Sequence, residues 1–155
     1  MVDILQSLKE TPGKFATDGI LQCPLPGLVV DGVGPICLPL CSSTAKKIIE
    51  VARQAPFGLG EKTIIDESVR KSWQIDPSKI TIKNPKFLSW LESLVLKVKS
   101  ELGCDSNLVT ANFYKLLLYE EGGHFKPHTD SEKEDGMFGT LIVQLPSLFK
   151  GNFVI

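Results

Sequence analysis

The chain has few of the residues that build common metal and redox motifs. It contains only two histidines, His124 and His128, and none of its four cysteines stands in CxxC spacing. The closest pair of cysteines is interrupted by Pro39, and too few histidines are present to complete a zinc cluster. We therefore expect structural or free thiols at Cys23, Cys37, Cys41 and Cys104.

Long apolar runs and an excess of one charge are also missing. No apolar stretch approaches the roughly 18 to 20 residues that span a bilayer. The N-terminus, Met1 to Thr11, lacks the apolar stretch of a secretory signal. Seventeen basic residues against eighteen acidic ones provide no basic face for nucleic acid or an anionic membrane. We expect a cytoplasmic or nuclear protein that binds neither nucleic acid nor membrane.

What is present is the composition of a globular domain. The chain has 155 residues, of which 43% are apolar and 23% charged, and it shows no repeat or linker. This length and this apolar share suffice for one domain with a buried core. We therefore expect one structural domain.

Three segments carry apolar residues at the spacing of an amphipathic helix. The first is Met1 to Glu10. The second begins with a cap at Ser42 or Ser43 and runs to about Arg53, with Ala45, Ile48, Ile49 and Ala52 as its buried stripe. The third begins at Asn84 with Pro85 in its first turn and ends at Gly103.

The remaining apolar segments read as strands. Brief strands and turns are expected around residues 20–21, 28–30 and 36–38, where prolines and glycines interrupt the chain. Leu108 to Tyr119 has the pattern of a strand buried on both faces. Further strands are predicted from Gly139 to Leu145 and from Phe153 onward. Because helices come first and consecutive strands follow, we predict an α+β fold with an antiparallel β-core.

The most informative short motif is His128-Thr129-Asp130. In extended backbone, residues 128 and 130 project to the same side, with Cα atoms roughly 6 to 7 Å apart. An imidazole and a carboxylate placed in this way are two of the three ligands of a mononuclear non-haem iron site. We therefore predict that His128 and Asp130 bind one metal ion.

The residues around this motif are similar to those of a known enzyme family. The stretch from Tyr119 to Asp130 contains a tyrosine, a glycine turn, an aromatic residue and a proline before HxD, and it resembles the prolyl 4-hydroxylase-like iron(II)- and 2-oxoglutarate-dependent dioxygenases. Gly139 to Ser147 resembles the next core strand of that family, and Val69 to Trp73 resembles its Arg-x-Ser segment. The resemblance covers residues 64–155, and we interpret residues 1–63 as a helical and strand support region.

This resemblance implies a double-stranded β-helix (jelly-roll) fold. It also implies hydroxylation of a C–H bond coupled to decarboxylation of 2-oxoglutarate to succinate. The cofactors implied are Fe(II), 2-oxoglutarate as cosubstrate and ascorbate, and the substrate is either a prolyl residue of a protein or a small molecule. By the same resemblance Tyr119 and Thr140 face the cosubstrate, and strand alternation adds Gln144 to the face of Thr140. Tyr119 and Thr140 could equally be ordinary hydrogen-bonded polar residues of a strand, and for Gln144 that interpretation is the better one.

Two parts of the family's site are not found in these residues. They are the second metal-binding histidine and the basic residue that pairs with the distal carboxylate of 2-oxoglutarate. No histidine follows Asp130, and Lys133 and Lys150 are the only basic residues there. Gly151-Asn152 stands where the family has paired glycines. We therefore expect only the first strands of the β-helix, weak iron binding and little turnover of 2-oxoglutarate by this chain alone. Open strand edges would favour a homodimer.

Two other interpretations remain open. The chain could be a non-catalytic interaction module of the same fold, or a zinc hydrolase using His124, His128 and Asp130. The hydrolase requires a helix, whereas Gly122-Gly123 and Pro127 disfavour one, and in extended chain the two histidines would be roughly 13 Å apart. We therefore expect His124 to be a surface or turn residue. We also expect residues 130–135 to form a solvated loop.

Overall fold

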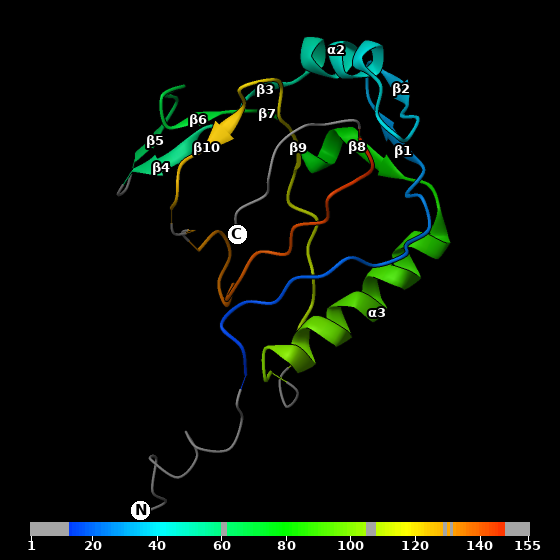
Figure 1. Cartoon of the computed structure of the whole chain (residues 1–155), viewed down its shortest axis with the longest axis vertical. Coiled ribbons are helices and arrows are strands. Elements are labelled where there is room, and N and C mark those ends of the chain that lie inside the picture. Colours follow the sequence, from blue (N-terminus) through cyan, green and yellow to red (C-terminus); the bar gives the residue numbers. More distant parts are fainter. Residues whose placement is uncertain (1–12, 60–61, 105–107, 129, 131, 148–155) are drawn as a thin grey trace, which may run out of the picture. The chain divides into compact units, whose positions relative to one another are not determined.

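The structure is a computed structural model that describes residues 13–59, 62–104, 108–128, 130 and 132–147. Within these residues two α-helices alternate with short strands that pair antiparallel (Figure 1). The predicted α+β class is confirmed. The predicted helix at Met1 to Glu10 and the strand from Phe153 lie outside the described residues.

The elements follow one another in an order that differs from the prediction. In sequence they are β1 (Leu28–Val30), β2 (Gly34–Pro35), α2 (Ser42–Val51), β3 (Arg53–Gln54), β4 (Phe57–Leu59), β5 (Lys62–Ile64), β6 (Arg70–Lys71), β7 (Trp73–Ile75), the 3₁₀ turn η1 (Pro77–Lys79), β8 (Ile80–Ile82), α3 (Pro85–Glu101), β9 (Leu116–Leu118) and β10 (His124–Phe125). Most strands precede α3, so the expectation of helices first and strands afterwards was wrong. Strands of two or three residues are too short to show an apolar alternation in the sequence.

The chain forms two compact units. One comprises Met1–Pro26 and Asn84–Asn112, and the other comprises Gly27–Lys83 and Phe113–Ile155. The predicted domain division between residues 63 and 64 stays a prediction.

The first unit contains α3, which confirms the third predicted helix. The Asn84 side chain accepts a hydrogen bond from the Lys86 amide at 3.0 Å, and Pro85 occupies the first turn. Gly103 adopts a positive φ of 71° where the helix ends. Phe87 is buried, whereas the next residue, Leu88, is 44% exposed.

The core of the second unit joins β1, α2 and β7. Its buried residues are Leu28, Val30, Ile36, Ile48 and Ile75. Helix α2 begins after Cys41 rather than after a capping serine, and no side chain caps it by a hydrogen bond. The helix ends at Val51, because Ala52 is extended and Arg53 already belongs to β3.

Four small sheets surround this core. Their strand orders are β2-β1-β8, β3-β7-β9, β10-β6 and β4-β5. The predicted strand at residues 28–30 is therefore confirmed as β1, whereas residues 20–21 and 36–38 form no strand. Strands β6, β7 and β10 carry only part of the segments that resemble the dioxygenases, and His128 and Asp130 follow β10 outside any strand.

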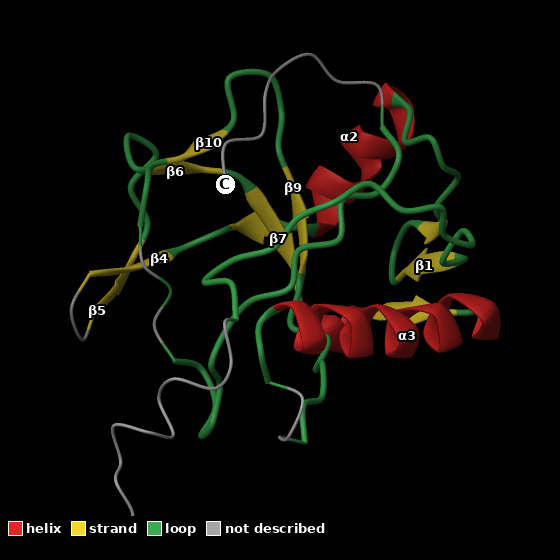
Figure 2. Cartoon of the chain, turned by 60° about the horizontal axis from the view of Figure 1, so that its bottom comes forward, coloured by secondary structure: helices red, strands yellow, loops and turns green. Residues whose placement is uncertain are grey.

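Two longer strand predictions were wrong. Of Leu108 to Tyr119 only Leu116–Leu118 is a strand, and Leu108 is 95% exposed. Strand β9 pairs with β7 alone, and Leu117 in its middle is exposed whereas Leu116 and Leu118 are partly buried, so it is not buried on both faces. Gly139 to Leu145 runs as a loop (orange to red in Figure 1, among the green loops of Figure 2), and Ser147 just after it forms an isolated bridge to Leu40.

Within the described part of the chain, no helix combines the length and apolar character needed to cross a bilayer. The four cysteines are free thiols.

Candidate metal site

His128 and Asp130 face one another just after β10. Nε2 of His128 lies 3.6 Å from Oδ1 of Asp130, and both side chains are partly exposed. Two atoms that each lie about 2.1 Å from one metal ion are separated by roughly 3 to 3.6 Å. The pair is therefore spaced as two ligands of one metal would be.

The other polar atoms of these two side chains are already engaged. Nδ1 of His128 lies 2.8 Å from the Lys126 carbonyl oxygen, which can only accept, so Nδ1 carries the proton and donates. Nε2 is the ring nitrogen that faces Asp130. Oδ2 of Asp130 accepts a hydrogen bond from Thr140 Oγ1 at 2.7 Å. Metal-binding histidines and carboxylates are usually oriented by such second contacts.

A stack of three side chains fixes the plane of the His128 ring. The imidazole lies against Phe125 with ring centroids 3.5 Å apart and an interplanar angle of 25°. The guanidinium carbon of Arg70 lies 4.3 Å from the centroid of the Phe125 ring. The β6–β10 pairing brings this about, because Arg70 is the register partner of Phe125.

Arg70 is itself held in place. It is buried, its Nε donates to Ser72 Oγ at 3.0 Å, and its Nη1 donates to the Pro56 carbonyl at 3.0 Å. The Arg-x-Ser segment thus serves a structural purpose that its sequence did not reveal: it supports the ring behind His128.

His124 does not join the pair. It is exposed on β10, with Nδ1 3.1 Å from the Gly122 carbonyl and Nε2 3.4 Å from the Ser68 carbonyl. The expectation of a surface histidine is confirmed. No group of three His, Cys, Asp or Glu side chains arranged around one metal position occurs in the described residues.

The predicted cosubstrate residues have different surroundings. Thr140 contacts the predicted metal ligand Asp130 directly. Tyr119 follows β9 and is 41% exposed, and Gln144 is exposed in the loop after Thr140. The roles of all three in cosubstrate binding stay predictions.

A hollow lies beside the carboxylate of Asp130. Its wall is formed by Asp130, Glu132, Met137, Phe138 and Gly139. The described residues of the acidic segment 130–135 are exposed, as expected for a solvated loop. The hollow combines an acidic edge with an apolar wall and therefore offers space next to the candidate metal position.

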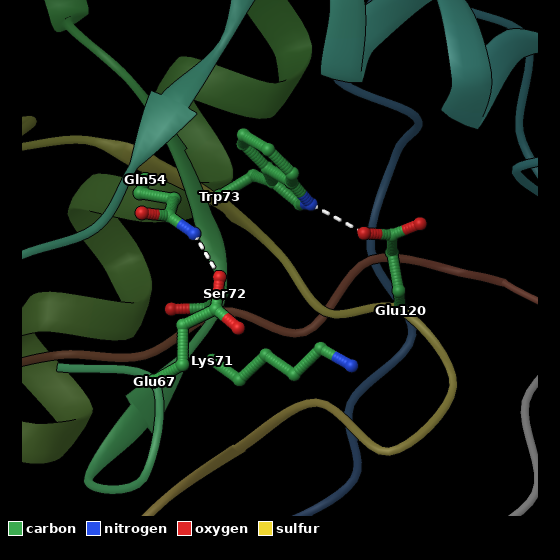
Figure 3. A pocket seen from close by; sticks show the side chains of 6 residues that line it. All are labelled: Gln54, Glu67, Lys71, Ser72, Trp73 and Glu120. Atoms are coloured by element: carbon green, nitrogen blue, oxygen red, sulfur yellow. Dashed lines mark hydrogen bonds between the residues drawn. The ribbon is translucent and has the colours of Figure 1, made fainter.

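A second depression lies on β6 and β7 and was not anticipated. It is lined by Gln54, Glu67, Lys71, Ser72, Trp73 and Glu120 (Figure 3). The Trp73 indole donates to Glu120, and the Gln54 amide donates to Glu67. Because these polar groups bind each other, the depression resembles a hydrogen-bonded surface rather than a ligand site.

Lys115 is the charged residue near the site that the sequence did not single out. It stands within the apolar run before β9 and is half-buried. Burial, followed by the charges of Arg70, Lys133 and Arg53, lowers the pKa of its amine to about 8, while Asp130 opposes this shift. A lysine inside an otherwise apolar run was the only available signal.

No family model matches the chain, and no curated protein or solved structure matches it either.

The Phe125 ring leads to a first testable prediction. Phe125→Leu removes the stack, so we expect the ring protons of His128 to shift downfield in the NMR spectrum and the affinity for Co(II) to fall by about ten-fold. With only two histidines in the chain, a His124→Asn variant assigns the His128 signals. Phe15→Leu, at a fully exposed position, is the matched control. Unchanged His128 signals in Phe125→Leu would contradict the stack.

Proposed function

We propose that this chain belongs to the iron(II)- and 2-oxoglutarate-dependent dioxygenases of the prolyl 4-hydroxylase-like class, with His128 and Asp130 as metal ligands. The observation that carries the proposal is the 3.6 Å separation of Nε2 of His128 and Oδ1 of Asp130. The other polar atom of each side chain is held by a second contact, Nδ1 by the Lys126 carbonyl and Oδ2 by the Thr140 hydroxyl. The motif from Tyr119 to Asp130 supplies the family.

The two donors are of types that Fe(II) takes, but they supply two of the three protein ligands of such a site, and no group of three occurs in the described residues. One neutral imidazole and one carboxylate are the ligand types of the 2-His-1-carboxylate site. Bound iron would supply the redox chemistry that couples decarboxylation of 2-oxoglutarate to hydroxylation of a C–H bond. The chain's own residues have simpler tasks. His128 presents Nε2, Asp130 presents Oδ1, Thr140 orients the carboxylate, and Phe125 orients the imidazole.

The fold and cofactors of the proposal follow from the same family. We take the β3-β7-β9 and β10-β6 sheets to be the first strands of a double-stranded β-helix. The family also implies ascorbate as a further cofactor. For the protein as a whole we propose a cytoplasmic or nuclear location. The hollow beside Asp130, walled by Met137 and Phe138, is where we place the cosubstrate or the C–H substrate. Its apolar wall is compatible with a prolyl ring or a small metabolite.

A second candidate function is a non-catalytic interaction module of the same fold. Strand β9 supports it, because in the described residues β9 pairs on one side only and its middle residue, Leu117, is exposed. An open strand edge is a template for pairing with another chain, including a second copy. Such a module would have no need of the oriented His128 and Asp130 pair.

An anaerobic Co(II) titration of the 155-residue chain tests the main proposal. We expect one bound equivalent, and we expect 2-oxoglutarate but not acetate to change the visible spectrum of the bound ion. His124→Ala should leave the affinity unchanged, because both ring nitrogens of His124 face backbone carbonyls. A large loss of affinity in His124→Ala would instead support the zinc hydrolase, and no binding by the unmodified chain would support the interaction module.

A further inference from the structure

Helix α3 carries a row of accessible side chains apart from the face that contains the buried Phe87. The row consists of Leu88, Glu92, Val95 and Lys99, which follow one another at positions i, i+4, i+7 and i+11 and therefore lie along one side of the helix. We call these four residues the α3 stripe. Leu88 is 44% exposed, Glu92 is exposed, and the other two are partly exposed. The stripe is thus open to a partner.

The described residues of the same compact unit leave the α3 stripe accessible. Residues 14–26, blue in Figure 1, run alongside α3 and are hydrogen-bonded to both of its ends, at Glu101 and at Asn84. Leu96, which borders the stripe, is nevertheless 65% exposed. Exposed apolar side chains that gather between charged ones are typical of a protein interaction surface.

The two charges of the α3 stripe are of opposite sign. Glu92 and Lys99 take part in none of the ion pairs found among the described residues. Seven residues separate them, which is about 10 Å along the helix axis and too far for an ion pair within one helix. Both charges are therefore available to a partner that offers the opposite charge at the same spacing.

A second copy of α3 offers this arrangement when it lies antiparallel to the first. In a two-fold symmetric pair, residue i of one copy faces residue j of the other, and j faces i. An axis that passes between Val95 and Leu96 sets Glu92 of each copy opposite Lys99 of the other. Two ion pairs then flank an apolar centre. A parallel pair would instead set like charges opposite one another.

We propose that the α3 stripe is the interface of a homodimer in which the two α3 helices pack antiparallel. The partner is a second copy of the chain, because the stripe is complementary to itself in charge and apolar character. The inference does not rest on the proposed function, since α3 and the His128–Asp130 pair belong to different compact units. Two helices of 17 residues form a small contact, so we expect a dissociation constant on the order of micromolar.

Charge reversal tests the proposal in the 155-residue chain by sedimentation equilibrium. Glu92→Lys and Lys99→Glu each turn two attractive pairs of the dimer into repulsive ones, so we expect each to weaken dimerisation by about ten-fold or more. The double variant restores the opposite charges and should dimerise like the unmodified chain. Lys86→Glu, at an exposed position on another side of α3, is the matched control and should leave the dissociation constant unchanged.

Mixing the two single variants shows whether a loss of dimer comes from charge or from misfolding. One variant carries only positive and the other only negative charge on the stripe, so an equimolar mixture should form a heterodimer. Its absence would overturn the proposal. A chain that stays monomeric up to about 1 mM would overturn it too. A dimer that Glu92→Lys leaves unchanged would use another surface, such as the edge of β9, and the α3 stripe would not be its interface.

Discussion

Asp130→Ala is expected to lower the affinity of the chain for Co(II) or Fe(II) by about 100-fold. The substitution removes one of the two proposed ligand atoms, Oδ1 of Asp130, which lies 3.6 Å from Nε2 of His128. It also removes the acceptor of the Thr140 hydroxyl. The imidazole of His128 keeps its bond to the Lys126 carbonyl and its stack on Phe125, so the remaining ligand stays oriented. Anaerobic titration followed by visible spectroscopy measures the change.

The control for this variant is Asp135→Ala. Asp135 is exposed in the same acidic segment, so its removal changes the net charge equally without touching the pair. We expect little change in metal affinity from it. Thr140→Val separates the loss of the ligand atom from the loss of its orientation, since it keeps both proposed ligands but removes the hydroxyl that orients Asp130. Similar losses in Asp130→Ala and Asp135→Ala would mean that the loop attracts metal by charge alone, and the two-ligand site would be wrong.

The local part of the site could be predicted from the sequence. His128 and Asp130 are two residues apart, so the strand period alone brings their side chains together. Helix α3 was also predictable, because Asn84, Pro85 and Gly103 mark its ends and a long periodic run lies between them. In both cases the residues that determine the structure are close to one another in the sequence.

The supporting contacts could not be predicted in the same way. Arg70 reaches the Phe125 ring across 55 positions of sequence, and only the β6–β10 pairing brings the two together. Both strands have two residues, too few for a recognisable pattern. Lys115 was overlooked because the surrounding apolar run indicated a strand buried on both faces, whereas β9 lies at a sheet edge. The missed contacts thus depend on which strands pair, whereas the wrong strand at Gly139 to Leu145 and the wrong cap of α2 are local errors.

Gly123→Ala is expected to lower the stability of the fold and to disturb the candidate metal site. A Cβ at residue 123 would lie 2.7 Å from the Glu120 carbonyl oxygen, 3.1 Å from the Glu120 nitrogen and 3.1 Å from the Lys71 carbonyl oxygen. All three atoms belong to the backbone, so no side chain can rotate away to make room. The Gly123 amide also donates to the Glu120 carbonyl at 2.8 Å, so the turn cannot open without losing that bond. We expect a loss of about 1 to 3 kcal/mol in the free energy of unfolding, measured by urea denaturation.

The same displacement should reach His128, because Gly123 directly precedes β10. Moving the turn away from Lys71 separates β10 from β6, and Phe125 then loses its place over Arg70. Gly122→Ala distinguishes this steric effect from backbone strain, because Gly122 has a φ of 71° but open space around its Cβ position. We expect this variant to lose about 1 to 2 kcal/mol in the free energy of unfolding without shifting the His128 signals. Gly19→Ala meets neither obstacle and should change stability by less than about 0.5 kcal/mol. If Gly123→Ala unfolds like Gly19→Ala and keeps its Co(II) affinity, the tight turn is not what positions the β10 strand and the ligands that follow it.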